Sequence, residues 1–390
     1  MYALSLASTE AVSFDVCFAS NLTHADNKVL QAALAGRRAL LVTTPTVARL
    51  YGDRTLPRHP DLRVAVLALS ERTKAIEAVL DVCRLAQELK LDRRSVLVAF
   101  GGGVCSDVVG FAASMIRRGI THIRVPTTLV GQIDAGVGLK TGVNFCAGKN
   151  YLGSFHPPER VLVDPTFLGT LPARELRQGL AEMVKIALVR DPALFVTLEE
   201  WGLRLLESRF RDPAAVAEHA IHRSVALMLT ELGANPFENR TLERLVDMGH
   251  TISPELESAS GFMLPHGESV AVDIALTCAL GVELRMLDEE DAQRTMALLE
   301  RLGLPTDHEL LDAALCRRAL QSAALHRGGR LNLVVPTAIG SADFVRDPAV
   351  VTDEILERGI RRLRAMPAAH RWDLAPAATR RAPVAACAGA

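Results

Sequence analysis

Short, continuous apolar runs alternate with segments of helical periodicity over the first half of the chain. The runs are too uniformly apolar for a sheet that keeps one face in water, so they predict a parallel sheet with helices on both faces. The predicted strands are Arg38–Thr44, Leu62–Leu69, Ser95–Phe100, His122–Val125 and Arg160–Val163, and the predicted helices lie near 46–51, 73–90 and 104–117.

A run of three glycines, Gly101-Gly102-Gly103, joins one of these strands to the helix that follows it. Unpaired N–H groups and the helix dipole converge at such a junction, which favours the binding of an anion such as a dinucleotide phosphate. A tight turn without a ligand is the alternative. Ligands of parallel sheets bind beyond the carboxyl ends of the strands, where Thr44, Glu71 and Thr127–Thr128 also fall.

The strand pattern gives way to long helical periodicity near Leu171, which predicts a domain boundary there. We therefore expect an α/β domain with a parallel, Rossmann-like sheet over residues 1–172 and a mainly α-helical, metal-binding domain over residues 173–365. Residues 366–390 are rich in alanine, proline and arginine, which predicts a disordered tail.

Three residues of the second half form a candidate metal site. Glu182 lies on a predicted helix, and His250 and His266 lie beside glycines, in Met-Gly-His-Thr and Pro-His-Gly-Glu. Two histidines and a carboxylate are a ligand set that zinc uses when one coordination position stays open. The glycines would let the backbone pass close to the ion. Histidines that only pack in the core or cap helices are the alternative reading.

Composition excludes several classes of function. The 44 basic and 45 acidic residues give a net charge of −1, so there is no electrostatic case for binding nucleic acid or an anionic membrane. We find no apolar run of transmembrane length and no signal pattern. Seven cysteines form no C-x-x-C pair, which indicates reduced thiols in a cytoplasmic protein. A catalytic role for Cys105 or Cys146 is disfavoured.

The segment between residues 126 and 150 combines many glycines with isolated polar residues, and it is too apolar for a solvated linker. Such a loop is typical of a functional site. With it, the chain resembles the dehydroquinate synthases and related sugar phosphate cyclases from about residue 38 to 340. The matching motifs are Gly101-Gly-Gly-x-x-x-Asp107-x-x-Gly110, Pro126-Thr-Thr, Lys140-Thr-Gly-Val-Asn144, Gly148-Lys-Asn150, Glu182-x-x-Lys185, Gly249-His250 and His266-Gly-Glu268.

The resemblance implies an enzyme that uses NAD⁺ and one divalent metal ion, zinc or cobalt, with a sugar phosphate as its substrate. It also implies a homodimer in which Arg118 reaches the phosphate site of the neighbouring subunit. The implied metal ligands are Glu182, His250 and His266. The implied NAD⁺ contacts are Thr44, Glu71, Lys74, Gly101, Gly102, Gly103, Asp107, Thr127, Thr128, Asp134, Lys140 and Lys149. The implied catalytic residues are Asp134, Lys140, Asn150 and Lys185, and Lys149 also binds substrate.

The chain departs from dehydroquinate synthases at positions that would meet a substrate carboxylate. Asp247 and Glu243 replace a neutral and a basic residue, Pro254 replaces a histidine, and a lysine is missing from segment 225–231. An acid facing a buried carboxylate is unfavourable, whereas Asp247 can accept a hydrogen bond from a hydroxymethyl group. With His326, these residues resemble the sedoheptulose 7-phosphate cyclases, and among them the 2-epi-5-epi-valiolone synthases.

That resemblance implies transient oxidation of sedoheptulose 7-phosphate, elimination of phosphate, reduction, and an intramolecular aldol reaction that closes the ring. Four alternatives stay open from sequence: a 3-dehydroquinate synthase, a cyclase of the 2-epi-valiolone or desmethyl-4-deoxygadusol type, a polyol dehydrogenase that uses NAD⁺ and a metal, and a non-catalytic binding protein.

Overall fold

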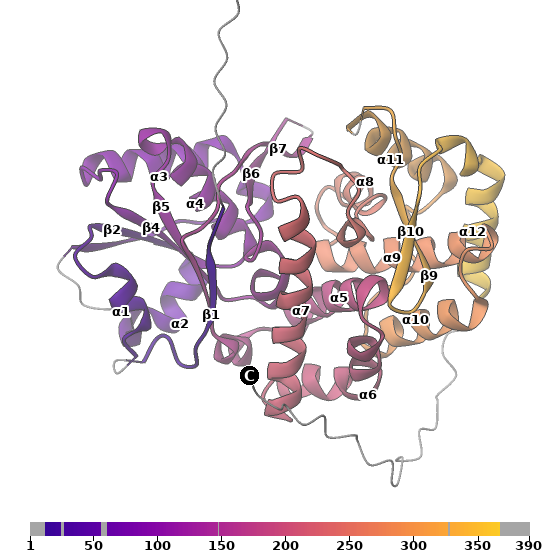
Figure 1. Cartoon of the computed structure of the whole chain (residues 1–390), viewed down its shortest axis with the longest axis horizontal. Coiled ribbons are helices and arrows are strands. Elements are labelled where there is room, and N and C mark those ends of the chain that lie inside the picture. The colour runs from indigo at the N-terminus through magenta and orange to yellow at the C-terminus, as the bar shows by residue number, and fades with distance from the viewer. Residues whose placement is uncertain (1–11, 25–26, 56–60, 147, 327, 367–390) are drawn as a thin grey trace, which may run out of the picture.

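A six-stranded parallel sheet forms the first half of the molecule, and helices form most of the second (Figure 1). The computed structural model describes residues 12–24, 27–55, 61–146, 148–326 and 328–366. The strands of the sheet are β1 (Asp15–Phe18), β2 (Ala39–Thr43), β3 (Leu62–Val66), β4 (Val96–Gly101), β5 (Thr121–Pro126) and β8 (Arg160–Val163).

The strands follow the order β1-β8-β5-β4-β2-β3, and every neighbouring pair is parallel. All five strands expected from the apolar runs are present, within a few residues of their predicted ends. β1 was not predicted. It pairs with β8 in the register Asp15↔Arg160, and it is a short edge strand whose residues are only partly buried, so it carries little hydrophobic signal.

Helices cover both faces of this sheet, as the apolar runs predict. Alternate residues of β2 point to opposite faces. Leu41 packs with Leu34 of α1 on one face, and Leu40 packs with Val79 of α3 on the other. Expected burial fails only at β3, where Val66 is 49% exposed because an edge strand has a neighbour on one side only. The covering helices are α1 (Val29–Leu34), α2 (Pro45–Thr55), α3 (Ile76–Glu88) and α4 (Gly103–Met115).

The segment expected to be a functional loop is partly a β-hairpin. After the π-helical turn η3 (Gly131–Ala135), strands β6 (Lys140–Phe145) and β7 (Gly148–Phe155) pair antiparallel. A Cβ built on Gly153 would lie 2.3 Å from the carbonyl oxygen of Thr141, so glycine is what lets the two backbones approach. The same glycines weaken the strand signal in the sequence, which is why the hairpin was missed.

The chain becomes helical at Ala173, close to the predicted change at Leu171, and a small antiparallel pair, β9 and β10, was not expected. The further elements are α5 (Ala173–Arg190), α6 (Pro192–Ser208), α7 (Ala214–Ala234), α8 (Ser253–Ala259), α9 (His266–Glu283), α10 (Glu289–Arg301), α11 (Ala313–His326), β9 (Leu333–Ala338), β10 (Ser341–Val345) and α12 (Asp353–Ala365). The predicted tail lies outside the described residues, apart from Met366.

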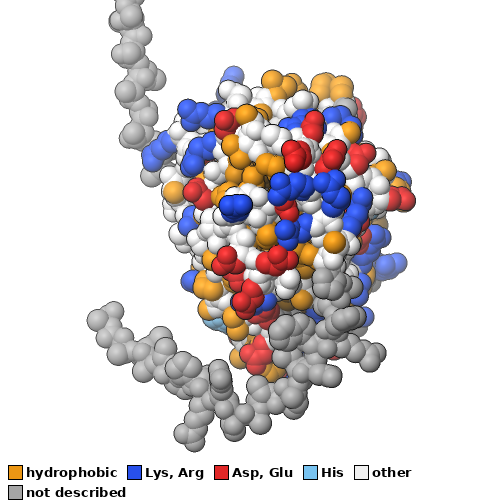
Figure 2. Space-filling view, turned by 90° about the vertical axis from the view of Figure 1, so that its right-hand side faces the viewer, with side chains coloured by type: hydrophobic (Ala, Val, Ile, Leu, Met, Phe, Trp, Pro, Cys, Tyr) orange, Lys and Arg blue, Asp and Glu red, His pale blue; other side chains and the backbone are white. Residues whose placement is uncertain are grey.

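Basic and acidic side chains are interspersed on the face that α12 helps to form (Figure 2). Arg362 bonds to Glu283 at 2.6 Å and to Glu289 at 2.9 Å, and Arg364 bonds to Asp307 at 2.9 Å. Acidic side chains therefore offset the charge of these two arginines. Within the described residues, none of the helices combines the length and apolarity that a membrane span requires.

Candidate active site

Three predicted metal ligands converge between α5 and the start of α9. Glu182 lies in the middle of α5, His250 follows a 3-10 turn that ends at Asp247, and His266 is the first residue of α9. The Oε1 atom of Glu182 is 3.1 Å from Nε2 of His266 and 3.8 Å from Nε2 of His250. One possible ligand atom from each residue lies within 4.8 Å of the others, which is close enough to share one ion.

The two histidines each use Nδ1 for a polar contact with an oxygen, so Nε2 is the nitrogen that would bind a metal. Nδ1 of His250 lies 3.0 Å from the carbonyl oxygen of Met248, and Nδ1 of His266 lies 2.9 Å from Oε1 of Glu257. In the tautomer in which each Nδ1 donates to its oxygen, each Nε2 would offer a lone pair to a metal ion. The buried carboxylate of Glu182 lies 3.1 Å from Nε2 of His266 through Oε1 and 2.6 Å from Nζ of Lys185 through Oε2. This donor set fits a divalent cation.

Lys185 and Asp134 extend the metal set into a buried charged cluster. The Nζ atom of Lys185 is 2.6 Å from Oε2 of Glu182 and 2.9 Å from Oδ2 of Asp134. Burial favours a neutral Glu182, but Lys185 and the two histidines outweigh burial and hold the pKa of Glu182 well below its usual range. Burial raises the pKa of Asp134 despite Lys185. The pKa values of the two carboxyls are thus pushed apart, as acid and base roles require.

The glycines beside the histidines allow the elements that carry them to pack closely. A Cβ on Gly267 would lie 2.3 Å from Cα of Gln178 on α5, and a Cβ on Gly249 would lie 3.0 Å from Cγ1 of Val270 on α9. These glycines let α9 pack closely against its neighbours, and Gly249 also adopts a φ of +73°. They place the ligands through close packing, and the expected approach of the backbone to the ion stays a prediction.

The glycine loop ends at the amino terminus of α4, as predicted. Gly102 is the N-cap, and it provides no side chain to bind the amides of the first turn, which also lacks acidic residues. A Cβ on Gly102 would lie 3.1 Å from Cγ2 of Thr128, and one on Gly101 would lie 3.9 Å from Cγ2 of Thr44. The predicted nucleotide contacts at residues 44, 101–103 and 127–128 therefore lie together at the carboxyl ends of β2, β4 and β5.

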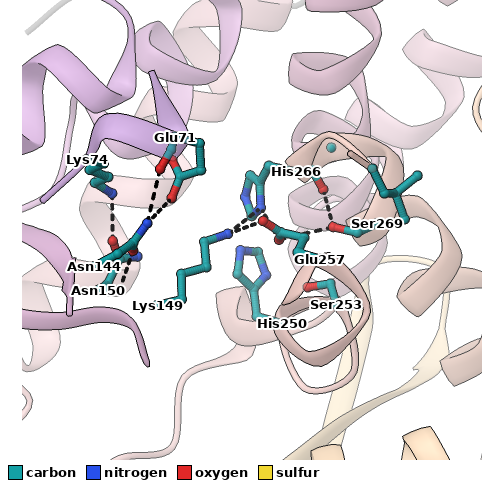
Figure 3. Close-up of polar contacts among 12 residues, drawn as sticks. Glu71, Lys74, Asn144, Lys149, Asn150, His250, Ser253, Glu257, His266 and Ser269 are labelled. Atoms are coloured by element: carbon teal, nitrogen blue, oxygen red, sulfur yellow. Dashed lines mark hydrogen bonds and ion pairs between the residues drawn. The ribbon is translucent and has the colours of Figure 1, made fainter. Parts of the chain in front are cut away.

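Glu71 and Lys74 bind the β6–β7 hairpin to this side of the sheet (Figure 3). Lys74 Nζ lies 2.6 Å from Oδ2 of Asp107 and 2.6 Å from Oδ1 of Asn150. Asn144 donates to Oε1 of Glu71 at 3.0 Å and accepts from the amide of Asn150 at 2.8 Å. Four predicted site residues therefore share one network. Asn144 had no predicted role, although it belongs to the quoted motif.

A pocket of about 430 Å³ opens beside this network, lined by Glu71, Lys74, Asn144, Cys146 and Phe262, among others. It joins the sheet half to the helical half. Exposed Cys146 borders it, while Cys105 is buried. Burial raises the pKa of Cys105 to about 12, so its thiol stays protonated and the expectation of no nucleophilic role agrees with the structure.

Lys149 extends from the hairpin to the metal set (Figure 3). Its Nζ atom forms an ion pair with Oε2 of Glu257 and lies 3.5 Å from Nδ1 of His266. Glu257, on α8, was quoted in a motif but was assigned no role. Its contacts come from α9 and β7, and pairings between distant segments leave no pattern in a single sequence.

The surroundings of the other predicted site residues are as follows. Lys140 is 56% exposed and pairs with Glu238 at 2.5 Å. Arg118 is exposed, with an unusual φ of 66°. Asp247 is partly buried, and its carbonyl oxygen accepts a hydrogen bond from the amide of His250 at 3.1 Å. His326 ends α11, but its side chain lies outside the described part of the chain.

Glu243 forms an ion pair that the sequence argument did not take into account. Two hydrogen bonds of 2.7 and 3.0 Å join it to Arg346, which lowers the pKa of Glu243 and neutralises its charge. This pairing offsets the negative charge that Glu243 would otherwise present to a substrate carboxylate.

A buried arginine organises the segment that leads from Asp134 to Lys140. The guanidinium of Arg124 on β5 donates to the carbonyl oxygens of Gly136 at 3.2 Å, Gly138 at 2.5 Å and Lys140 at 3.4 Å. Burial lowers the pKa of Arg124 to about 10, which still leaves it charged near neutral pH. The sequence did not predict this role, because a single arginine within an apolar strand belongs to no recognisable motif.

Comparison with known proteins places this site in a family. The model described as "3-dehydroquinate synthase N-terminal" matches residues 64–178, and the model described as "3-dehydroquinate synthase C-terminal" matches residues 179–323. Together they span more than half of the chain. The chain therefore belongs to the dehydroquinate synthase family of sugar phosphate cyclases.

Two relatives with different names are similar to this chain over most of its length. A 2-epi-5-epi-valiolone synthase from Streptomyces glaucescens is 45% identical over 346 residues, 86% of this chain and 87% of that protein. A 3-dehydroquinate synthase from Halorhodospira halophila is 38% identical over 336 residues, 85% of this chain and 93% of that protein.

A solved structure has the same fold over nearly its whole length. The 2-epi-5-epi-valiolone synthase from Streptomyces hygroscopicus subsp. jinggangensis 5008, with NAD⁺ and Zn²⁺ bound, has a TM-score of 0.87 and 39% identity, covering 93% of this chain and 99% of that chain. The α/β half with its parallel sheet and the helical half, both expected from the sequence, are thus confirmed.

Proposed function

We propose that this protein converts sedoheptulose 7-phosphate into 2-epi-5-epi-valiolone with release of phosphate, using NAD⁺ and one divalent metal ion. The observation that carries the proposal is the convergence of Glu182, His250 and His266, with the Nε2 atoms of both histidines facing Glu182, beside Lys185 and Asp134. The identity to a 2-epi-5-epi-valiolone synthase, 45% against 38% for a dehydroquinate synthase, supports the choice within the family.

The residues that would bind NAD⁺ and the metal ion are those already described. Glu182, His250 and His266 would bind the metal. The amides of Gly101–Gly103, together with Lys74 and Asp107, would bind NAD⁺. When bound, NAD⁺ supplies a reversible hydride acceptor and the metal supplies a Lewis acid for a substrate oxygen.

The surrounding side chains would supply charge and proton transfer. Asp134 and Glu182 raise the pKa of Lys185 despite its burial, so Lys185 stays a cation that can stabilise developing negative charge. Asp134, whose pKa is raised by burial, is the carboxyl of this cluster best suited to hold a proton. Asn150 and Lys149, fixed by Lys74 and Glu257, would orient the sugar from the opposite side.

Asp247 would determine the choice of substrate. It lies three residues before His250 and is joined to it by a hydrogen bond between their backbones. An anion at this position repels a carboxylate but can accept a hydrogen bond from a hydroxymethyl group, and bonds to charged groups are the stronger kind. Glu243, whose charge is offset by Arg346, is expected to contribute less to this distinction.

The direct test measures phosphate release from purified, metal-loaded protein with NAD⁺. We expect release from sedoheptulose 7-phosphate without accumulation of NADH, since the hydride is returned, and a cyclic product whose configuration is identified by NMR. Release only from the dehydroquinate precursor would assign the chain to the dehydroquinate synthases instead. Accumulation of NADH without phosphate release would indicate a polyol dehydrogenase.

We further propose that the enzyme is a homodimer in which Arg118 acts in the partner's site. An exposed arginine with a φ of 66° is a strained arrangement of the kind found at functional sites, and a guanidinium suits bidentate binding of phosphate. Subunit complementation tests this. Heterodimers of Arg118→Ala and His250→Ala chains should regain one working site. Verified heterodimers that stay inactive, or an active monomer, would contradict it.

A further inference from the structure

Glu257 contacts both halves of the molecule at the metal set. Its side chain is 3% exposed. Oε1 accepts hydrogen bonds from Nδ1 of His266 at 2.9 Å and from Oγ of Ser269 at 3.1 Å, both on α9. Oε2 forms an ion pair with Nζ of Lys149, which reaches it from β7. Figure 3 shows the carboxylate between Lys149 and His266.

We propose that Glu257 is a positioning residue that links the metal site to the hairpin. By accepting the Nδ1 proton, it fixes the tautomer of His266 and turns Nε2 toward Glu182, which lies 3.1 Å away. By pairing with Lys149, it holds the ammonium group 3.5 Å from that same imidazole. One buried carboxylate thus determines the geometry of a metal ligand and of a substrate-side cation.

The two partners of Glu257 have opposite electrostatic effects on a bound divalent cation. A carboxylate bonded to a ligating histidine makes that histidine a better ligand. The ammonium of Lys149 would repel the cation, and Glu257 offsets that repulsion because its negative charge is paired with Lys149. Removal of Glu257 should therefore weaken metal binding, and removal of Lys149 alone should strengthen it.

The test measures metal affinity in the full-length apoprotein, by chelator competition with Zn²⁺ and by the absorption spectrum after Co²⁺ loading. No substrate or NAD⁺ is added. We expect Glu257→Gln to weaken Zn²⁺ binding by about ten- to a hundred-fold and to alter the cobalt bands. Lys149→Met should tighten binding by a few-fold. Glu255→Gln is the matched control, because Glu255 lies on the same helix but faces outward and pairs with Arg318 at 3.1 Å.

Zinc affinity of Glu257→Gln within two-fold of the parent would overturn the proposal, as would weaker binding in Lys149→Met. If Glu257→Gln does not fold, Glu257→Asp keeps the charge but is too short to reach both partners, and it should lose part of the affinity. The inference rests on the proposed metal site. His250→Ala separates the two, because full metal binding in that variant would refute the site itself, whereas normal binding only in Glu257→Gln would refute the link.

Discussion

The helices that carry the metal ligands and the hairpin that carries Lys149 and Asn150 reach the same site by different means. On the helical side, close packing sets the positions. A Cβ on Gly179 of α5 would lie 2.3 Å from Cγ of Leu129, and one on Gly267 of α9 would lie 2.3 Å from Cα of Gln178. On the hairpin side, polar contacts set them, through Lys74, Asn144 and Glu257.

This difference predicts which property a substitution on each side should change. A packed interior resists small changes in volume, so altering it costs stability and geometry together. A hydrogen bond at a partly exposed site contributes about 1 kcal/mol, and its loss lowers affinity while the fold survives. Variants on the two sides should therefore be distinguishable by comparing metal content, binding and unfolding.

The largest effect should come from His250→Ala, which removes a ligand from the helical side. We expect loss of bound metal and a fall in kcat/KM of roughly a thousand-fold, since a metal supplies several kcal/mol of transition-state stabilisation. Elemental analysis and phosphate-release assays measure both. His219→Ala, on the exposed side of α7, is the control and should keep its metal. Full metal occupancy in His250→Ala would refute the ligand assignment.

A smaller but more diagnostic effect is expected from Gly267→Ala. The new methyl group meets the backbone of Gln178, which cannot rotate away, so α5 and α9 must separate. We expect a loss of about 1–3 kcal/mol of unfolding free energy together with weaker metal binding. Gly52→Ala is the matched control, since its Cβ meets nothing within 4 Å. Equal stability of the two variants would show that packing does not position the ligands.

Asp247→Asn tests substrate choice at constant volume. Loss of a charge-assisted hydrogen bond should cost roughly ten- to a hundred-fold in kcat/KM for sedoheptulose 7-phosphate. Glu243→Gln is its control and should change little, because an ion pair with Arg346 near the surface contributes about 1 kcal/mol or less. If Asp247→Asn leaves the kinetics unchanged, or if Glu243→Gln has the larger effect, the pocket assignment is wrong.

The smallest effect belongs to the hairpin side. Asn144→Ala removes the partly buried bond to Glu71 and the acceptor of the exposed bond from the amide of Asn150. We expect about 1 kcal/mol, or roughly a five-fold loss of NAD⁺ affinity, with metal content and the unfolding temperature preserved. A stability loss as large as that of Gly267→Ala would remove the proposed distinction between the two sides.

The sequence predicted best what packing determines over short distances. Five strands were found because residues such as Leu40 and Leu41 are buried on opposite faces, which gives an unbroken apolar run. The metal set and the glycine loop were found because their residue types are distinctive. Family resemblance supplied the remaining roles.

The sequence did not predict what depends on contacts between distant segments. The hairpin was missed because glycines such as Gly153 mask its strands. Glu257 and Arg124 were missed because their partners lie on other elements. Glu243 was misjudged because its partner, Arg346, is about a hundred residues away. Charge at one position has no fixed meaning until its neighbours in space are known.

The pairing of β1 with β8 has a consequence for how the chain is made. Asp15 lies opposite Arg160, so this edge of the sheet stays open until β8 has left the ribosome. Everything between β5 and β8, including η3 and the hairpin, must be synthesised before the edge closes. Contacts between such distant segments form slowly, since a long loop must close first. The backbone N–H and C=O groups along this edge of β5 therefore lack their strand partner while the segment that holds Asp134, Lys140 and Lys149 is being translated.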